Sequence, residues 1–271
     1  MAMERAIALA AALVATSGSA SPGAAPDRVL IVMDELEQMQ ALAASLGAAA
    51  GLAPEITGQE ALPPDWTPYA AVLAYVHGDL QPETERRMID YTRAGGRLVV
   101  LHHTISSGKV RNEHWFDFLG VALPGASESR NPAPLGGHYA WREHVALTVV
   151  NLAPDHYITS HEITWPEVTR YASSDRPSVE REYPSLTLEP SEAYMNVHFT
   201  DGRQKTVLLG FAYLDDRNGV LFMQDREGWL KPAGDGWIVY LQMGHFVEEW
   251  RHPVVAQLVL NAIRWRPNEG P

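Results

Sequence analysis

The sequence predicts an α/β fold: a doubly wound, mostly parallel sheet, flavodoxin-like, with β-rich additions in the second half of the chain. Short and almost purely apolar segments at residues 29–33, 70–76 and 97–101 predict buried parallel strands. Helical patterns separate them, at residues 36–50 and from residue 82 to the glycine pair that follows. Strands joined by helix-length crossovers are typical of doubly wound sheets, whose helices cover both faces.

Each element of the first half has a local reason to form. The helix at 36–50 has apolar residues at helical spacing, and a short strand is predicted at 54–57. Pro82 begins the second helix, because proline is tolerated in a first turn and the acidic residues that follow suit the positive end. Gly95 and Gly96 end it, since glycine readily adopts the conformation that ends a helix.

Short strand patterns separated by Gly, Asp and Pro turns dominate the second half. Strands are predicted at residues 145–150, 193–199, 205–212, 219–224 and 237–243, followed by a helix at 253–265. A polar stretch with four prolines lies between residues 165 and 190 and is longer than an ordinary connection. We expect this stretch to form an ordered excursion, or a lid.

The composition excludes several classes of function. The chain has 271 residues, of which 46% are hydrophobic, as expected for a packed globular core. A net charge of −12 without any Lys/Arg-rich run argues against nucleic acid as a partner. The absence of cysteine excludes disulfides, thiolate metal sites and a cysteine nucleophile.

The N-terminal sequence predicts export. A basic residue, ten apolar residues and a run of small residues follow one another within residues 1–25, the order found in a signal peptide and leader. Ten apolar residues are too few for the alternative, a membrane anchor. We expect one domain over residues 27–268, located outside the cell or in the periplasm and not inserted into a membrane after cleavage.

Histidines follow two of the predicted core strands, where ligands bind in open α/β sheets. His102 and His103 follow the strand at 97–101, and His245 follows the strand at 237–243. His77 is expected at the same rim. If the first strand continued through both adjacent histidines, their side chains would point to opposite faces, so one of them, His102, is expected in the cleft.

Imidazoles with a carboxylate suit zinc, manganese or iron, and His138 and Glu192 are further candidates. These residues are scattered along the sequence and lack a diagnostic metal-binding spacing. The structural alternative therefore stays open for each: a histidine bonded to nearby backbone, or a solvated carboxylate.

Other chemistry has less support in the sequence. It contains no nucleophile elbow, phosphate-binding loop or dinucleotide fingerprint. Ser106 and Ser107 follow the histidine pair, which keeps a serine hydrolase open as a third possibility. Trp115 could stack on a sugar ring, although core packing is the commoner role of tryptophan.

Several segments occur in the order and approximate spacing of a known family. They are Gly95-Gly96-Arg97-Leu98-Val99-Val100-Leu101-His102, residues 115–120, Gly137-His138, residues 155–159, Glu192-Ala193-Tyr194, residues 241–245 and residues 261–265. Together they resemble the ThuA-like (trehalose utilisation) domain, from residue 28 to residue 267. The resemblance implies the class I glutamine amidotransferase-like superfamily, but amidotransferase activity is excluded because the chain has no cysteine.

The resemblance also implies a role in sugar metabolism, particularly with 3-keto sugars made by partner dehydrogenases. The positions that match a family-type polar pocket are His102, His138, Glu192 and His245. The chain departs from the family pattern at Tyr157, where proline is usual, at Ser191, where aspartate is usual, and in the loop that begins at Asp34. Substrate preference therefore does not transfer from the family.

These observations predict a secreted carbohydrate-processing enzyme. It would act on a keto-sugar or a glycoside by hydrolysis, elimination or isomerisation, with a small carbohydrate as its partner. His102 and His245 are expected as general base and acid, and Glu192 as the residue that orients a histidine. The substrate-binding residues are expected to be His103, Trp115, His138 and Tyr194.

The expected cofactor is a divalent zinc, manganese or iron ion. Its ligands would be His102, His138, Glu192 and His245, and it would polarise a sugar carbonyl or hydroxyl. Metal-free catalysis by histidines stays open. The alternative from another class is a non-catalytic sugar-binding or scaffold module that has the amidotransferase-like fold.

Overall fold

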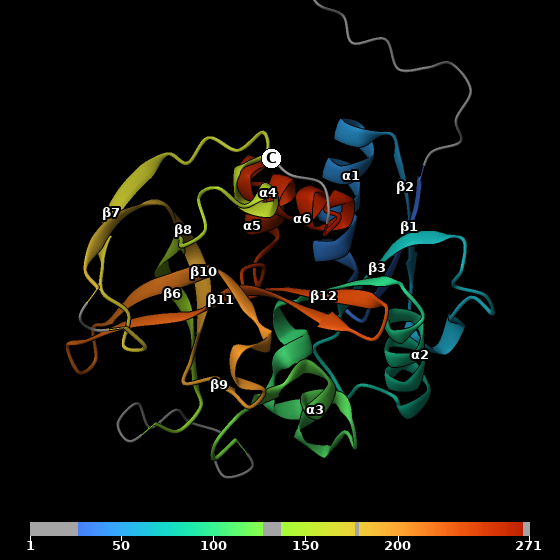
Figure 1. The fold of residues 1–271 in the computed structure, drawn as a ribbon, viewed down its shortest axis with the longest axis horizontal. Coiled ribbons are helices and arrows are strands. Elements are labelled where there is room, and N and C mark those ends of the chain that lie inside the picture. The colour runs from blue at the N-terminus through green and yellow to red at the C-terminus, as the bar shows by residue number, and fades with distance from the viewer. Residues whose placement is uncertain (1–26, 127–136, 177–178, 268–271) are drawn as a thin grey trace, which may run out of the picture.

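A single ten-stranded sheet runs through the computed structural model, which describes residues 27–126, 137–176 and 179–267. The strand order is β2-β1-β3-β4-β12-β11-β10-β6-β8-β7. Helices cover the half that contains β1 to β4, and long strands form the other half (Figure 1). The predicted leader, residues 1–25, lies outside the described residues.

The first half of the sheet is parallel. Its strands are β1 (Asp27–Met33), β2 (Leu52–Thr57), β3 (Tyr69–Tyr75), β4 (Arg97–Leu101) and β12 (Gly236–Leu241). Val29 and Ile31 of β1 pack in the core cluster under one face, and Leu30 and Val32 pack in the cluster under the other. This alternation buries both faces of the sheet, as expected for a parallel strand between two helical layers.

Three longer helices provide those layers. They are α1 (Leu36–Ala50), α2 (Pro82–Arg93) and α6 (Pro253–Arg264). The core cluster on one face contains apolar residues of α1 and α6, and the cluster on the other face contains those of α2. The predicted doubly wound α/β fold is therefore confirmed.

The second half of the sheet is antiparallel, so the sheet as a whole is mixed. Its strands are β6 (Ala140–Asn151), β7 (Glu167–Tyr171), β8 (Arg181–Met195), β10 (Thr206–Asp215) and β11 (Val220–Ala233). These strands are the predicted β-rich additions. They fan away from the helices, with β7 at the outer edge (Figure 1).

The stretch between residues 165 and 190 is regular, which corrects the expectation of an excursion or lid. It contains β7 and the first part of β8, which pair with each other in antiparallel register. Pro190 and Glu189 fall in a register shift between β6 and β8. Proline is tolerated at such bulges, and so the prolines do not prevent strand formation.

The remaining elements are short. They are the helices α3 (Trp115–Leu119), α4 (Tyr157–Ser160) and α5 (Val247–Arg251), the paired strands β5 (Val121–Ala122) and β9 (His198–Phe199), and the 3-10 segments η1 (Gln59–Ala61), η2 (His102–Ile105), η3 (Ser107–Arg111) and η4 (Gly202–Gln204). The segments η2 and α5 follow β4 and β12, and so they lie at the carboxyl edge of the parallel half. Within the described residues, no helix has both the length and the apolar character needed to cross a bilayer.

Candidate metal centre

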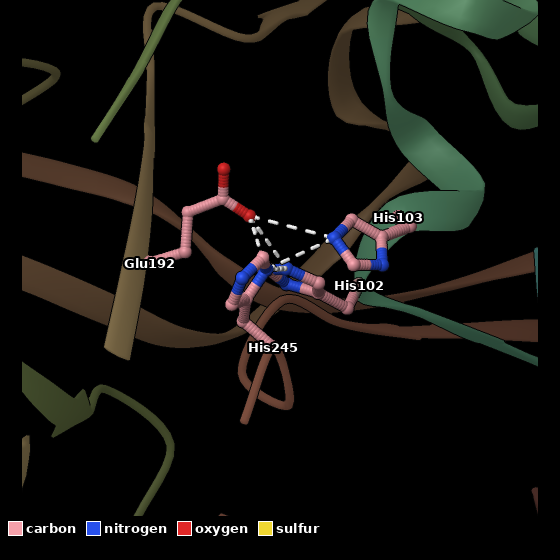
Figure 2. Close-up of side chains that lie close together, drawn as sticks. All are labelled: His102, His103, Glu192 and His245. Carbon is pink, nitrogen blue, oxygen red and sulfur yellow. Dashed lines mark hydrogen bonds and ion pairs between the residues drawn. The ribbon is translucent and has the colours of Figure 1, made fainter. Parts of the chain in front are cut away.

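Four side chains from separate parts of the chain converge at the carboxyl edge of the parallel strands: His102, His103, Glu192 and His245 (Figure 2). The Oε2 atom of Glu192 lies 2.8 Å from His102 Nε2 and 3.0 Å from His245 Nδ1. His103 Nε2 lies 3.0 Å from His245 Nδ1. One ligand atom from each side chain therefore faces a common point.

The spacing of these four atoms fits a tetrahedral metal ion. Two further separations are 3.3 Å, from His102 Nε2 to His245 Nδ1, and 3.6 Å, from His103 Nε2 to Glu192 Oε2. A tetrahedron with metal–ligand bonds of about 2.1 Å has edges of about 3.4 Å. Three imidazoles and a carboxylate are ligands suited to zinc, manganese or iron. Donor type and geometry thus agree.

Both adjacent histidines join the cluster because extended backbone ends before them. The strand β4 stops at Leu101, and His102 begins the 3-10 segment η2 with a φ of 39°. The sequence-based expectation that only one of the pair faces the cleft was wrong, since it assumed that the strand continues. The tight turn directs His102 and His103 to the same side.

His102 is fully buried and has a fixed proton. Its Nδ1 is hydrogen-bonded to the backbone carbonyl of Gln242, and a carbonyl only accepts, so the hydrogen is on Nδ1 and the Nε2 lone pair faces Glu192. Burial, together with the neighbouring His103, lowers the pKa of His102 to about 4. His102 is therefore neutral at neutral pH, the form that binds a metal.

Glu192 supplies the negative charge of the cluster. Burial raises the pKa of its carboxyl, but hydrogen bonds from His102, His103 and His245 outweigh burial and hold that pKa far below its usual range. Glu192 lies on β8, opposite Glu143 of β6. The antiparallel half of the sheet therefore contributes a carboxylate to a site formed mainly by the parallel half.

His245 is the most accessible member, with 19% of its side chain exposed. Burial lowers its pKa, but the hydrogen bond and charge of Glu192 outweigh burial, so that the net pKa is raised. The preceding Gly244 has a φ of 118°, and a Cβ there would lie 1.9 Å from the Trp250 ring. Tyr75 Oη donates a hydrogen bond to the Gly244 carbonyl at 2.8 Å. These contacts fix the direction of His245.

Tyr194 lies against the cluster, as expected of a substrate-binding candidate. Its ring stacks on His102 with centroids 4.9 Å apart, and its hydroxyl oxygen lies 3.4 Å from His102 Nε2. Burial raises the pKa of Tyr194 well above its usual value, so the phenol keeps its proton. This hydroxyl is suited to donate a hydrogen bond next to the metal ligands.

Two predicted substrate-binding residues lie elsewhere. Trp115 is fully buried, and its indole N–H donates to the Thr104 carbonyl at 2.8 Å, in line with the packing role that the sequence left open. His138 is exposed and lies outside the four-residue group, and its backbone carbonyl accepts a hydrogen bond from Asn196. His103 completes the group in place of the expected His138.

Sequence reasoning missed Glu35, which contacts the cluster from behind. Its Oε2 lies 3.0 Å from His103 Nδ1, and its Oε1 lies 3.2 Å from His77 Nδ1. The available signal was position, since Glu35 follows β1 at the same edge of the sheet. Lys109 is also fully buried, and its Nζ donates to the His77 carbonyl at 2.7 Å and to Ser106 Oγ at 3.1 Å.

Several solved structures share this fold at low sequence identity. A ThuA-like protein from Bacteroides uniformis is 18% identical over 91% of this chain and 94% of its own, with a TM-score of 0.56. A β-galactosidase from Bacillus circulans is 12% identical over 86% of this chain, with a TM-score of 0.47, and this chain spans 31% of its length. A protein described as belonging to GMP synthase, from Thermoplasma acidophilum, is 8% identical over 88% of this chain and 93% of its own, with a TM-score of 0.46.

No curated protein matches the chain. The sequence profile described as ThuA, trehalose utilisation, matches residues 28–266, which is nearly all of the part that the structure describes. This range contains both halves of the sheet and every member of the cluster. The chain therefore belongs to the ThuA (trehalose utilisation) family.

Proposed function

We propose that this chain is an exported, metal-dependent enzyme that acts on a small carbohydrate, with a keto-sugar as the preferred class of substrate. The observation that supports this most is the buried cluster of His102, His103, Glu192 and His245, whose ligand atoms have tetrahedral spacing. The family's association with trehalose utilisation supports a sugar. The N-terminal sequence pattern supports export.

The chemistry supplied at this site by a bound divalent ion is polarisation of a sugar carbonyl or hydroxyl oxygen. Such polarisation makes the hydrogen next to a ketone more acidic and favours elimination or isomerisation. His102 holds its proton on Nδ1 against Gln242, so its role is to bind and orient rather than to transfer protons. Tyr194 keeps its hydroxyl proton and would donate it in a hydrogen bond to a substrate oxygen.

His245 differs from His102 because it reaches the exposed side of the cluster. Its Nδ1 faces Glu192, whereas its Nε2 lies 3.6 Å from Glu143, a carboxylate with 46% of its side chain exposed. Protons can exchange with solvent along this pair. The acid–base step is therefore assigned to the His245–Glu143 side of the cluster.

Metal content tests the proposal. Untagged protein would be incubated with Zn²⁺, Mn²⁺ or Fe²⁺, desalted, and analysed for metal per chain. We expect near-stoichiometric metal in the wild type and in His138→Ala, the matched control outside the cluster, and a loss of at least tenfold in His102→Ala and His245→Ala. Metal-free wild type, or variants that all retain metal, would overturn the proposal.

Turnover is the second measurement. The same four proteins would be assayed with 3-keto-glucosides and with the parent glucosides. We expect the wild type and His138→Ala to convert the keto forms, and His102→Ala and His245→Ala to lose at least 100-fold in kcat/KM. Full activity in both cluster variants would exclude the cluster from catalysis.

One observation favours a second candidate, a serine hydrolase. Ser106 Oγ is half-buried and lies 3.1 Å from Lys109 Nζ, and burial lowers the pKa of Lys109 to about 7. A neutral lysine can accept the proton of a serine hydroxyl as the oxygen bonds to an acyl carbon, and can return that proton to the departing alcohol. The substrate would then be an ester.

Labelling separates this candidate from the metal enzyme. A fluorophosphonate probe should label the wild type and Ser107→Ala, but not Ser106→Ala or Lys109→Met. The absence of labelling in the wild type would end the hydrolase candidate and leave the metal centre unaffected.

A further inference from the structure

Glu35 occupies the place in this fold where a ligand crevice is expected. The strand β1 pairs with β2 on one side and with β3 on the other, while α1 and α2 contribute to the core clusters on opposite faces of the sheet. Strand order therefore reverses between β1 and β3, and ligands bind at the carboxyl ends of strands at such a point. Glu35 follows β1 there, and His77 follows β3.

One carboxylate lies between two imidazoles at this point. Glu35 Oε2 contacts His103 Nδ1 at 3.0 Å, and Glu35 Oε1 contacts His77 Nδ1 at 3.2 Å. Both atoms of the first contact are shielded from solvent. The other nitrogen of His103, Nε2, belongs to the four-atom cluster and lies 3.0 Å from His245 Nδ1. His103 is thus the link between Glu35 and the candidate metal centre.

These contacts do not form a second metal site in the observed conformation. The rings of His77 and His103 are stacked, with centroids 4.2 Å apart and planes inclined by 14°. An ion bound by an imidazole lies in the plane of its ring, and two stacked, nearly parallel planes do not share such a point. The arrangement fits a carboxylate that accepts one N–H from each ring.

The backbone around Glu35 is fixed by its neighbour. The Asp34 carboxylate accepts hydrogen bonds from the backbone N–H groups of His77, at 2.7 Å, and Gly78, at 2.6 Å. The segment after β3 is thereby held against the end of β1. Glu35 starts from a fixed position and does not depend on a flexible loop.

We propose that Glu35 is a positioning residue, which holds the proton of His103 on Nδ1 and so presents Nε2, unprotonated, to the metal centre. A neutral imidazole carries one proton, and the nitrogen that carries it cannot bind a metal. The Gln242 carbonyl does the same for His102. Two acceptors of different kinds, a backbone carbonyl and a carboxylate, thus set the same tautomer in adjacent histidines.

The test compares Glu35→Leu with Glu37→Leu. Glu37 is exposed and two residues further along the chain, so it controls for the loss of a charge in the first turn of α1. Histidine tautomers would be read from long-range proton–nitrogen NMR spectra of metal-free, ¹⁵N-labelled protein, with His103 assigned by its absence from His103→Gln. Zn²⁺ affinity would be measured by competition with a chelator.

We expect wild type and Glu37→Leu to show His103 with its proton on Nδ1, and Glu35→Leu to show a mixture of tautomers. The Zn²⁺ dissociation constant should rise about 10- to 100-fold in Glu35→Leu, the usual effect of removing such a partner, and change by less than threefold in Glu37→Leu. Glu35→Ala carries the same expectations if the leucine variant does not fold. An unchanged tautomer in the folded Glu35 variant overturns the proposal.

The affinity measurement rests on the proposed function, whereas the tautomer measurement does not. A wild type that binds no metal, but whose His103 tautomer depends on Glu35, leaves the positioning role intact and rejects the metal enzyme. Tight Zn²⁺ binding with equal tautomers and equal affinities in wild type and Glu35→Leu leaves the metal centre intact and rejects the positioning role.

Discussion

His102 and His103 show how two neighbouring residues of one type reach the same cluster under different control. His102 is neutral because it is buried, and its proton is held by a main-chain carbonyl. His103 contacts a side chain, Glu35, that can be replaced by mutation. Substitution at residue 35 therefore tests the hydrogen bond without removing a ligand.

The sequence indicated three of the four cluster residues. His102 and His245 follow predicted core strands, and Glu192 lies in a segment that resembles the family, so position and resemblance both pointed to them. His103 was assigned to substrate binding because alternation in a strand would turn it away from His102. A tight turn after Leu101 decides the outcome, and no local sequence pattern announces it.

Glu227 provides a residue-scale prediction about pH. It is fully buried on β11, and its Oε2 accepts a hydrogen bond from Gln242 Nε2 at 2.7 Å. Burial, and then the charge of Glu249, raises the pKa of Glu227 far above its usual value. The unfolded chain loses this proton above about pH 4.5 while the folded chain keeps it. Stability therefore falls by up to about 1.4 kcal/mol per pH unit from that point until the folded pKa is reached.

Glu227→Gln removes this titration and keeps the acceptor oxygen. Its melting temperature, relative to the wild type, should increase between pH 5 and pH 8 by several degrees, since about 1 kcal/mol corresponds to 2–4 °C in a chain of this size. Thermal unfolding of metal-free protein across this range would measure the effect, with Glu37→Gln as the exposed control. Parallel profiles for Glu227→Gln and the wild type would contradict the prediction.

At the scale of elements, the parallel half follows from the sequence almost strand for strand. The predicted segments at 29–33, 70–76 and 97–101 are β1, β3 and β4, and the predicted helices are α1 and α2. Apolar runs and helical spacing record burial directly, and burial determines these elements. The β7–β8 hairpin was missed because its stability comes from cross-strand pairing, which leaves a weaker pattern in either strand alone.

The turn between β12 and α5 gives an element-scale prediction. Gly244→Ala places a Cβ against Trp250 at a φ that side chains rarely adopt, so the turn must move and take His245 with it. We expect a loss of about 2–3 kcal/mol in the free energy of unfolding and a loss of metal similar to that of His245→Ala. Denaturant unfolding and metal analysis would measure both effects.

Gly47→Ala is the matched control for that substitution. Gly47 lies within α1, and nothing is within 4 Å of its Cβ position. Alanine is the better helix former by about 1 kcal/mol, so this variant should be as stable as the wild type or more so, with unchanged metal content. Equal behaviour of the two alanine variants would show that the turn at Gly244 does not hold His245.

At the scale of the whole molecule, the cluster connects the two halves of the sheet. His102, His103 and His245 follow parallel strands, and Glu192 comes from β8 in the antiparallel half. An ion bound at this point would resist separation of the halves. This arrangement was beyond sequence analysis, because it depends on how β8 is placed three-dimensionally against β6.

Zn²⁺ should therefore stabilise the entire fold. At a free concentration 100 times the dissociation constant, the expected gain is about 2.7 kcal/mol, or roughly 5–10 °C in melting temperature. Differential scanning calorimetry with Zn²⁺ and with a chelator would measure the shift. Glu192→Gln should lose most of the shift, and a Zn²⁺ effect confined to a minor early transition would argue that the ion does not connect the halves.

The position of β12 has a consequence for how the molecule is made. This strand, Gly236–Leu241, lies in the middle of the sheet between β4 and β11, yet it is the last of the strands along the chain. While the polypeptide emerges from the ribosome, β4 has no partner on that side, and the antiparallel strands have no parallel partner to join. Assembly of the central sheet must await nearly the whole chain, a topology of distant pairings that folds slowly. A chain that crosses a membrane before folding would thus still lack its metal pocket in transit, and would acquire the ion only at its destination.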